Sequence, residues 1–262
     1  MPKTDKHPPG TFCWIELATT DQNGAKSFYG SLFGWSIKDL PTSPDAVYSM
    51  FQLEGSDAAA AYTIRAEQRA QGVPPHWMLY VAVENADDAA NRAAQLGGVV
   101  LAPAFDVFDA GRMAVLQDPT GATFSVWQPK QHAGTGIVGV AGTLCWADLS
   151  TPDQARAGEF YFGLFGWTVA TEDESGHGYF HIKNGEEFIG GIPPATHRDS
   201  NTPPHWLAYF LVSDCDGAAA KAKELGAQFY MPPTTFEDVG RFAVLADPQG
   251  ALFAIFQSSR HG

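Results

Sequence analysis

Residues 10–35 read GTFCWIELATTDQNGAKSFYGSLFGW and residues 142–167 read GTLCWADLSTPDQARAGEFYFGLFGW, so one pattern occurs twice at an offset of 142 − 10 = 132 residues. Two further pairs recur in the same order at an offset of 129 residues (203 − 74 and 240 − 111): PPHWMLYVAV with PPHWLAYFLV, and GRMAVLQDPTGATF with GRFAVLADPQGALF. Repeated blocks in one order indicate an internal duplication. The chain is therefore one unit of about 130 residues written twice, which is an ordinary domain size.

The composition of the 262 residues limits the class of protein. Hydrophobic residues make up 45% of the chain, enough for two cores, and no stretch is both apolar and long enough to cross a bilayer. The first residues, MPKTDKHPPG, lack the apolar run of a secretory signal, so we expect a cytoplasmic protein. The net charge of −13 repels nucleic acid and anionic membranes. The expected partner is a small-molecule ligand, and we expect a monomer or a homodimer.

Each half of the chain follows one order of elements. A strand at 12–18 leads to Asp21, a typical helix N-cap residue, and the helix that follows ends at Gly34. Its apolar residues recur with helical spacing at Ala25, Phe28, Tyr29 and Leu32. Strands are predicted next at 36–40, 48–53 and 58–64, then a strand at 76–83, a helix at 86–96, and strands at 99–101, 113–117 and 123–128. Each half thus contains two βαβββ modules.

The repeat and the glycine-rich segment PKQHAGTGIVGVAG between the halves set the domain boundaries. We predict a flexible N-terminus at 1–9, a first domain at 10–129, a linker at 130–141, a second domain at 142–258 and a tail at 259–262. Because each half holds two complete modules, pairing of modules within a half is favoured. Exchange of modules between the halves is the alternative.

The motifs of the chain resemble those of a known family. FYGSLFGW at 28–35 and FYFGLFGW at 160–167 close the first helix of each half, and DPTG at 118–121 and DPQG at 247–250 precede the last strand. This combination resembles the vicinal oxygen chelate superfamily, which includes glyoxalase I, extradiol dioxygenases and bleomycin-resistance proteins. The tandem arrangement is similar to that of bacterial glyoxalase-like proteins with two such domains. Because this scaffold hosts many reactions, the resemblance predicts the fold rather than the chemistry.

The resemblance implies an α+β fold of four βαβββ modules. They form two domains, each an eight-stranded half-open barrel, or cup, with its helices on the convex side. It also implies where a metal enzyme of the family carries its ligands. In this sequence those positions are Trp14, Met78, Ser125 and Ala60 in the first half, and Trp146, Leu207, Ala254 and Ile189 or Gly190 in the second. None is a His, Glu, Asp or Gln, whereas a catalytic divalent metal needs about three such ligands. We therefore expect no cofactor, although a divalent metal at a relocated site stays as an alternative.

The alternation of residues along a strand predicts which side chains face each cup. On the first strand, Cys13, Ile15 and Leu17 are expected to face the helix, whereas Phe12, Trp14, Glu16 and Ala18 face the cup. The predicted ligand-binding residues are Trp14, Met78, Tyr80, Ser125 and Trp127 in the first cup, and Trp146, Leu207, Tyr209 and Phe256 in the second. Such a lining suits a small apolar, aromatic or carbonyl-containing molecule.

The candidate catalytic residues are one acid and one histidine in each cup. Glu16 and Asp148 lie two residues after the tryptophans, where an apolar wall makes an unpaired carboxylate costly; structural hydrogen bonds are the alternative explanation. His76 and His205 follow a Pro-Pro pair at a strand start and could serve as acid and base, or only as loop-edge residues. Three functions remain open: a metal-independent protein that binds or transforms a small molecule, a metal-dependent glyoxalase-type lyase or extradiol dioxygenase, and an interaction protein with vestigial cups.

Overall fold

The computed structural model describes residues 3–44, 46–170, 178–199 and 201–259. The first half contains β1 (Phe12–Thr19), α1 (Gln22–Phe33), β2 (Ser36–Ser43), β3 (Ala46–Leu53), β4 (Ser56–Thr63), the short α2 (Ala66–Ala70), β5 (His76–Ala82), α3 (Ala86–Gln95), β6 (Val99–Val107), β7 (Gly111–Gln117) and β8 (Thr123–Pro129). The second half repeats the order with β9 (Leu144–Ser150), α4 (Gln154–Phe165), β10 (Thr168–Ala170), β11 (Phe180–Asn184), β12 (Glu187–Ile192), the 3₁₀ turn η1 (Ala195–His197), β13 (His205–Leu211), α5 (Cys215–Glu224), β14 (Gln228–Phe236), β15 (Gly240–Ala246) and β16 (Leu252–Ser258). No helix among the described residues is long and apolar enough to span a membrane.

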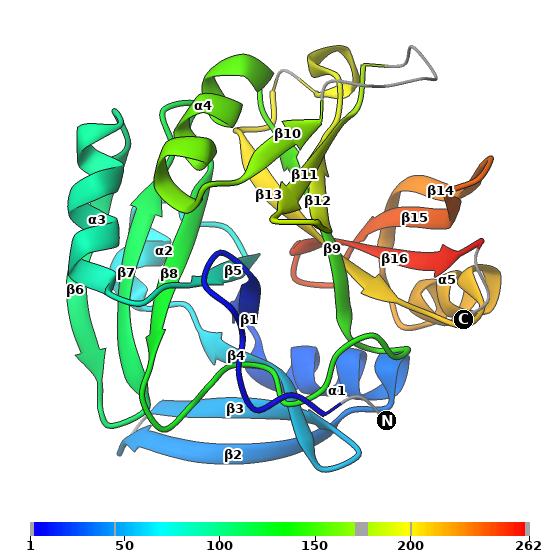
Figure 1. Ribbon diagram of the computed structural model, residues 1–262. Coiled ribbons are helices and arrows are strands. Elements are labelled where there is room, and N and C mark those ends of the chain that lie inside the picture. The colour runs from blue at the N-terminus through cyan, green and yellow to red at the C-terminus, as the bar shows by residue number, and fades with distance from the viewer. Residues whose placement is uncertain (1–2, 45, 171–177, 200, 260–262) are drawn as a thin grey trace.

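Each half builds one open, eight-stranded sheet, and none of the described strands is exchanged between the two sheets (Figure 1). The strand orders are β2-β3-β4-β1-β5-β8-β7-β6 and β10-β11-β12-β9-β13-β16-β15-β14. In the first sheet β1 pairs antiparallel with β5, which joins the two modules, while β4 and β8 lie parallel to β1 and β5. The four βαβββ modules and the half-open cups predicted from the sequence are confirmed. We call the concave sides of the two sheets the N-terminal cup and the C-terminal cup.

The helix that follows the first strand of each half begins and ends as the motif predicts. The side chain of Asp21 accepts a hydrogen bond from the free backbone N–H of Gly24, and Gly34 closes the helix in a left-handed conformation, with φ at 74°. Asp153 caps the start of α4 in the same way, and Gly166 closes its end. The caps therefore set where each helix begins and ends, and the apolar side of α1 is buried in the hydrophobic core.

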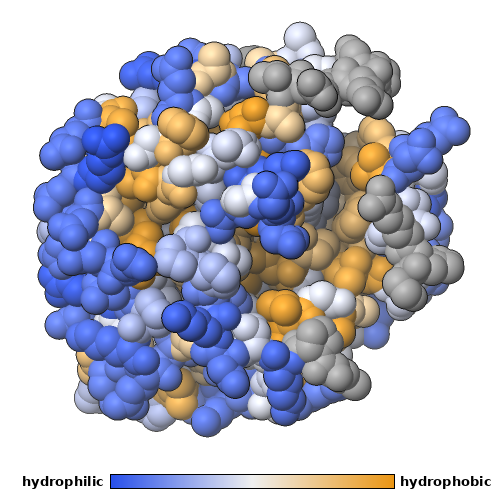
Figure 2. Space-filling model, viewed as in Figure 1, coloured by the Kyte–Doolittle hydropathy of each residue, from blue (hydrophilic) through white to orange (hydrophobic). Residues whose placement is uncertain are grey.

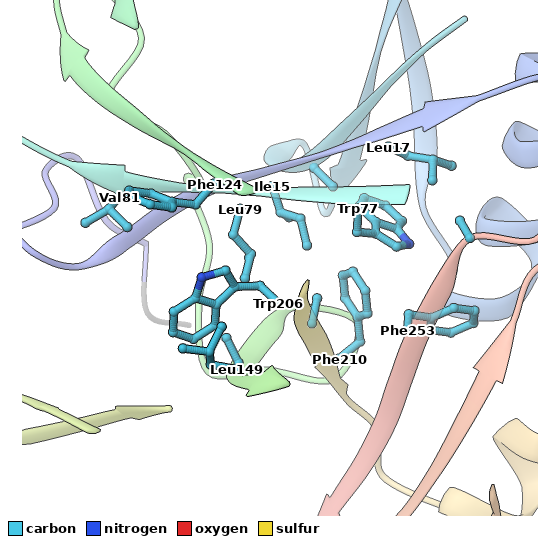
Figure 3. Packing of buried hydrophobic residues seen from close by; sticks show 14 of the residues in the cluster. Ile15, Leu17, Trp77, Leu79, Val81, Phe124, Leu149, Trp206, Phe210 and Phe253 are labelled. Atoms are coloured by element: carbon cyan, nitrogen blue, oxygen red, sulfur yellow. The ribbon is translucent and has the colours of Figure 1, made fainter. Parts of the chain in front are cut away.

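The two cups lie back to back and share one hydrophobic core. Trp77 and Leu79 from β5 lie against Trp206 and Phe210 from β13, and the rings of Trp77 and Phe210 are 5.2 Å apart (Figure 3). Because both sheets bury their convex sides in this core, their concave sides face outward. The concave sides are therefore where a ligand could reach the sheets.

The repeated motifs hold this core together across the two halves. Tyr29 in FYGSLFGW donates a hydrogen bond of 3.0 Å to Asp247 in the DPQG turn of the other half, and it accepts one from Trp77. Tyr161 and Asp118 form the reciprocal pair, also at 3.0 Å. Each aromatic motif thus binds the turn of the opposite half.

One detail of the first strand differs from the sequence prediction. The pairing of β1 with β5 shifts register between Phe12 and Trp14, which marks a β-bulge. A bulge inserts one residue and inverts the alternation of faces beyond it. Phe12 therefore packs against Trp167 and Trp206 in the shared core, and Cys13 lies on the cup side, the opposite of the predicted arrangement. From Trp14 onward the predicted faces are correct.

Candidate functional site

A cluster of buried side chains lines the N-terminal cup. Trp14, Met78, Tyr80 and Trp127 are all buried and pack together with Met50 in a second hydrophobic cluster, separate from the core between the halves. The strands β1, β5 and β8 thus bring together the ligand-binding residues predicted for this cup. Ser125 on β8 pairs in register with Tyr80 and is also buried.

A hydrogen-bonded carboxylate lies in this cluster. Glu16 accepts hydrogen bonds from the hydroxyls of Tyr80, through a very short contact, and of Tyr48, at 2.8 Å. The indole N–H of Trp14 donates to the oxygen of Tyr48 at 3.1 Å. The acid is therefore bound by one tyrosine from the same module and one from the neighbouring module.

The C-terminal cup repeats this arrangement. Asp148 accepts hydrogen bonds from Tyr179 at 2.6 Å, from Tyr209 at 2.8 Å and from the indole N–H of Trp146 at 3.0 Å. The same N–H also lies 2.9 Å from the hydroxyl oxygen of Tyr179. We call each group of one acid, one tryptophan and two tyrosines a carboxylate cluster. The sequence singled out three of its four members in each cup.

The fourth member, Tyr48 or Tyr179, was not predicted. The two residues are copies of one position, at an offset of 179 − 48 = 131 residues, but the residues around them differ: AVYSMF in one copy and GHGYFH in the other. A search for tyrosines at an offset between 129 and 132 could have found the pair.

In each carboxylate cluster, the residue beside the acid on the neighbouring strand differs with the length of that acid. Gly191 pairs with Asp148 on the neighbouring strand, and a Cβ on Gly191 would lie 1.9 Å from the hydroxyl of Tyr179. In the N-terminal cup Ala60 takes the place of Gly191, beside Glu16. Aspartate is one methylene shorter than glutamate, so the tyrosine must approach more closely, and the glycine leaves room for it. Both cups thus retain the cluster with different residues.

Burial dominates the electrostatics of the clusters. It raises the pKa of the Glu16 and Asp148 carboxyls above the ordinary range, and the hydrogen bonds from the tyrosines oppose this shift in part. Burial and the neighbouring carboxyl also raise the pKa of Tyr80 and Tyr209 far above normal. The phenols therefore keep their protons and act as donors to the acids.

The predicted histidines lie apart from these hydrogen bonds. His76 is paired with Ala18, and its Nδ1 is 2.8 Å from the carbonyl oxygen of Pro74. His205 has the same contact with Pro203, at 2.9 Å. Burial lowers the pKa of both histidines, so they are less basic than usual. Over the described residues, no hydrogen bond joins either histidine to the acid of its cup.

The remaining predicted residues of the C-terminal cup lie on the strands beside Asp148. Leu207 pairs with Asp148, and Phe256 pairs with Phe242 on β15. The ring of Phe242 contacts Tyr209 edge-on at 5.6 Å. It also stacks at 4.7 Å on Phe236, which is 42% exposed. Figure 2 shows an apolar recess in this region of the molecule, over β9, β13 and β16.

The cysteines do not suit nucleophilic chemistry. Burial raises the pKa of Cys13 and of Cys145 to about 12, so the reactive thiolate is disfavoured at neutral pH. Their thiols donate to the carbonyl oxygens of Tyr80 and Tyr209, at 3.5 and 3.4 Å. Both cysteines therefore act as small residues that pack beside the clusters.

The side chains of the cups do not fit a divalent metal. Across the part of the chain that the structure describes, no group of three or more His, Cys, Asp or Glu side chains could hold an ion. Each cup offers one carboxylate, and phenol and indole donors bind it. A metal site in an enzyme needs about three nitrogen, oxygen or sulfur ligands on one ion.

Two matches place this chain in a family. The Glyoxalase/Bleomycin resistance protein/Dioxygenase superfamily matches residues 11–126 and 143–255, one match for each half. The chain belongs to this superfamily. The "Putative glyoxylase CFP32" of Mycobacterium tuberculosis (strain CDC 1551 / Oshkosh) is 43% identical to it and covers 98% of both chains.

More distant relatives and solved structures agree with the fold. The "Anthracycline biosynthesis protein DauV" of Streptomyces sp. (strain C5) is 31% identical, over 95% of this chain and 94% of its own. The Mn(II)-bound glyoxalase from Novosphingobium aromaticivorans superposes with a TM-score of 0.65 at 13% identity, over 95% of this chain and 82% of that one. The 2,3-dioxygenase LapB from Pseudomonas sp. KL28 gives the same TM-score, over 97% and 95%. Identity this low shows the fold alone.

Proposed function

We propose that this superfamily member binds a small hydroxylated aromatic molecule on the concave side of its sheet, without a metal. The observation that carries the proposal is the carboxylate cluster, which occurs in both cups beside aromatic side chains. A buried acid is costly unless it is hydrogen-bonded. Both cups supply such hydrogen bonds, to Glu16 in the N-terminal cup and to Asp148 in the C-terminal cup.

The hydrogen bonds of the cluster define the polar group of the ligand. Tyr179 and Tyr209 use their protons on Asp148, so what they still offer is the lone pairs of their oxygens. The Asp148 oxygens also accept bonds and donate none when the acid is ionised. A ligand that reaches the cluster must therefore bring a donor, such as a phenolic hydroxyl.

The apolar lining defines the rest of the ligand. Trp146 is half-buried, and Phe242 with the partly exposed Phe236 continues the aromatic surface toward the open side of the C-terminal cup. Flat aromatic molecules stack or pack edge-on against such rings. The relatives named for anthracycline biosynthesis are in keeping with an aromatic ligand.

A second candidate function is proton transfer on the same ligand. Burial raises the pKa of Asp148, which makes its carboxylate a stronger base, and such shifts are common at active sites. In that case the hydroxyl that binds the cluster is also the group that loses its proton.

The test compares 2-naphthol with 2-methoxynaphthalene, which keeps the rings but lacks the donor. Calorimetry and tryptophan fluorescence on EDTA-treated protein should show binding of 2-naphthol at least about tenfold tighter, equivalent to ~1.4 kcal/mol. Asp148→Asn and Tyr209→Phe should remove this preference, whereas Tyr230→Phe, at an exposed position of β14, should leave it unchanged. Equal affinity for the two compounds, or binding only after addition of Zn²⁺, Mn²⁺ or Ni²⁺, would refute the proposal.

A further inference from the structure

The segment that follows β8 crosses the N-terminal cup. We call residues 130–137 the strap; in Figure 1 it is the start of the green loop that leaves β8 on the way to β9. Its first residues bond the turn between β6 and β7, where His132 N–H donates to Ala110 O at 3.0 Å. Its last residues reach β1 and β4, where Thr135 N–H donates to Cys13 O at 2.8 Å and Gly136 N–H to Asp57 O at 2.7 Å. The strap is thus fixed on both sides of the cup.

The strap fits closely against the sheet. Gly134 has φ at 120°, and a Cβ there would lie 2.2 Å from the carbonyl oxygen of Cys13, so the backbone itself contacts the first strand. His7 from the N-terminal segment adds a hydrogen bond of 2.9 Å to Thr135 O. The β-bulge of β1 lies beside Cys13, where the register with β5 shifts.

His132 is the strap residue that enters the aromatic cluster of the cup. Its ring lies edge-on against Trp14, with centroids 4.6 Å apart, and 6.1 Å from the ring of Trp127. The indole N–H of Trp127 donates to His132 O at 2.9 Å. Trp14 is only 4% exposed. The imidazole has the position and orientation of an aromatic ring bound to the cup.

The imidazole contributes shape rather than polarity. Its Nε2 is buried and has no hydrogen-bond partner, and burial lowers the pKa of the ring. A ring that was selected for its nitrogen would be expected to have both nitrogens paired. His132 therefore fills space against Trp14 and Trp127.

The C-terminal cup differs at the same place. Its tryptophan, Trp146, is half-buried, and its ring contacts His181 from β11 at 6.1 Å, which belongs to the sheet itself. Within the described ranges, no segment beyond β16 packs on Trp146 as His132 packs on Trp14. Ser259, the last described residue, bonds the turn between β14 and β15.

We propose that His132 is a built-in ligand that occupies the N-terminal cup, so that each chain binds external ligand only in the C-terminal cup. The claim that external ligand binds only in the C-terminal cup rests on the proposed function, whereas the claim that His132 occupies the N-terminal cup rests on the strap alone. It also defines a latent site: without the imidazole, the space between Trp14 and Trp127 should accept a free five-membered aromatic ring.

The first test removes the ring and returns it as a free molecule. Calorimetry should show that His132→Gly binds one 4-methylimidazole per chain and that the compound raises the melting temperature of this variant. Wild type and His197→Gly, which lacks an exposed histidine of the second half, should bind none. A folded His132→Gly that binds no 4-methylimidazole, or a compound that stabilises all three proteins equally, would overturn the inference.

The second test counts external ligands. Wild type should bind one 2-naphthol per chain, and Trp146→Ala should lose it while Trp14→Phe keeps it. Two equivalents per chain, or loss in Trp14→Phe alone, would contradict the assignment of the ligand to the C-terminal cup. If wild type binds no 2-naphthol, the proposed function fails, but the 4-methylimidazole result still decides whether His132 is an internal ligand.

Should His132→Gly not fold, His132→Phe replaces it in the first test. His132→Phe is expected to have a higher melting temperature than His132→Ala, and the reverse order would overturn the inference.

Discussion

In the C-terminal cup, Gly191 leaves the space that Tyr179 needs to reach the short side chain of Asp148. Gly191→Ala places a methyl group where the hydroxyl of Tyr179 lies, 1.9 Å away, so the tyrosine must leave Asp148. Asp148 then loses a donor at 2.6 Å, and Trp146 loses one of its two acceptors. A hydrogen bond to a charged group contributes about 1.5–3 kcal/mol and a neutral one about 0.5–1.5. We expect a loss of about 2–4 kcal/mol of unfolding free energy.

A second substitution should recover much of this loss. Asp148→Glu alone adds a methylene to a filled cluster, which costs about 1–3 kcal/mol. Combined with Gly191→Ala it recreates the Glu16 and Ala60 pair of the N-terminal cup, in which the tyrosine hydroxyl bonds the acid at 2.8 Å. The longer acid reaches the displaced Tyr179, so the double variant should be more stable than the sum of the two losses by at least ~1 kcal/mol.

Urea unfolding of the four proteins, followed by circular dichroism and fluorescence, measures this coupling. The matched control is Gly190→Ala, whose Cβ would meet the backbone oxygen of Ala147 at 2.3 Å. A longer acid cannot relieve that contact, so Asp148→Glu should not rescue Gly190→Ala. If the losses of Gly191→Ala and Asp148→Glu add within about 0.5 kcal/mol, the residues do not compensate as inferred and the reasoning is refuted.

Three further outcomes test other parts of the structure. Tyr29→Phe leaves Oδ2 of Asp247 without the tyrosine donor and Trp77 without an acceptor, so urea unfolding should show a loss of about 2–4 kcal/mol; a loss below ~1 would contradict a role for this hydroxyl in joining the halves. Gly134→Ala should loosen the strap and increase acrylamide quenching of tryptophan fluorescence; unchanged quenching would contradict the close fit. Burial lowers the pKa of His132, so the unfolded chain binds a proton first as the pH falls below about 6.5, and stability is lost in that direction. The stability of wild type relative to His132→Phe should therefore fall between pH 7.5 and pH 5 in urea unfolding; a constant difference would contradict it.

The sequence predicted the faces of the first strand only as far as its pairing stays regular. Alternation correctly places Trp14 and Glu16 on the cup side and Ile15 on the core side. It fails for Phe12 and Cys13, because the bulge between Phe12 and Trp14 adds a residue that no local pattern reveals. A one-residue shift exchanges the two faces, so a single irregularity is enough to misplace both side chains.

The hydrogen-bond partners of the acids were harder to predict than the acids themselves. A carboxylate beside a tryptophan on an apolar strand needs donors, and this need follows from the sequence alone. One donor, Tyr80 or Tyr209, lies on the strand next to the acid, but the other comes from β3 or from the chain before β11, where the two copies keep a tyrosine but little else. Histidines on the same face were predicted to act with the acids, but in the structure tyrosines donate the hydrogen bonds to them.

The motifs that identify the family lie at the back of the cups, which explains why they predict the fold and not the reaction. Asp118 of DPTG uses one oxygen to bond the backbone of its own turn, at Thr120 and Gly121, and the other to accept from Tyr161 of the opposite half. Trp35, which ends FYGSLFGW, donates to the backbone of Gly142 across the same core. These residues hold two sheets together whatever their concave sides contain. Chemistry can therefore change in the cups while the motifs stay, and the function of this chain has to be sought in the carboxylate clusters and the strap.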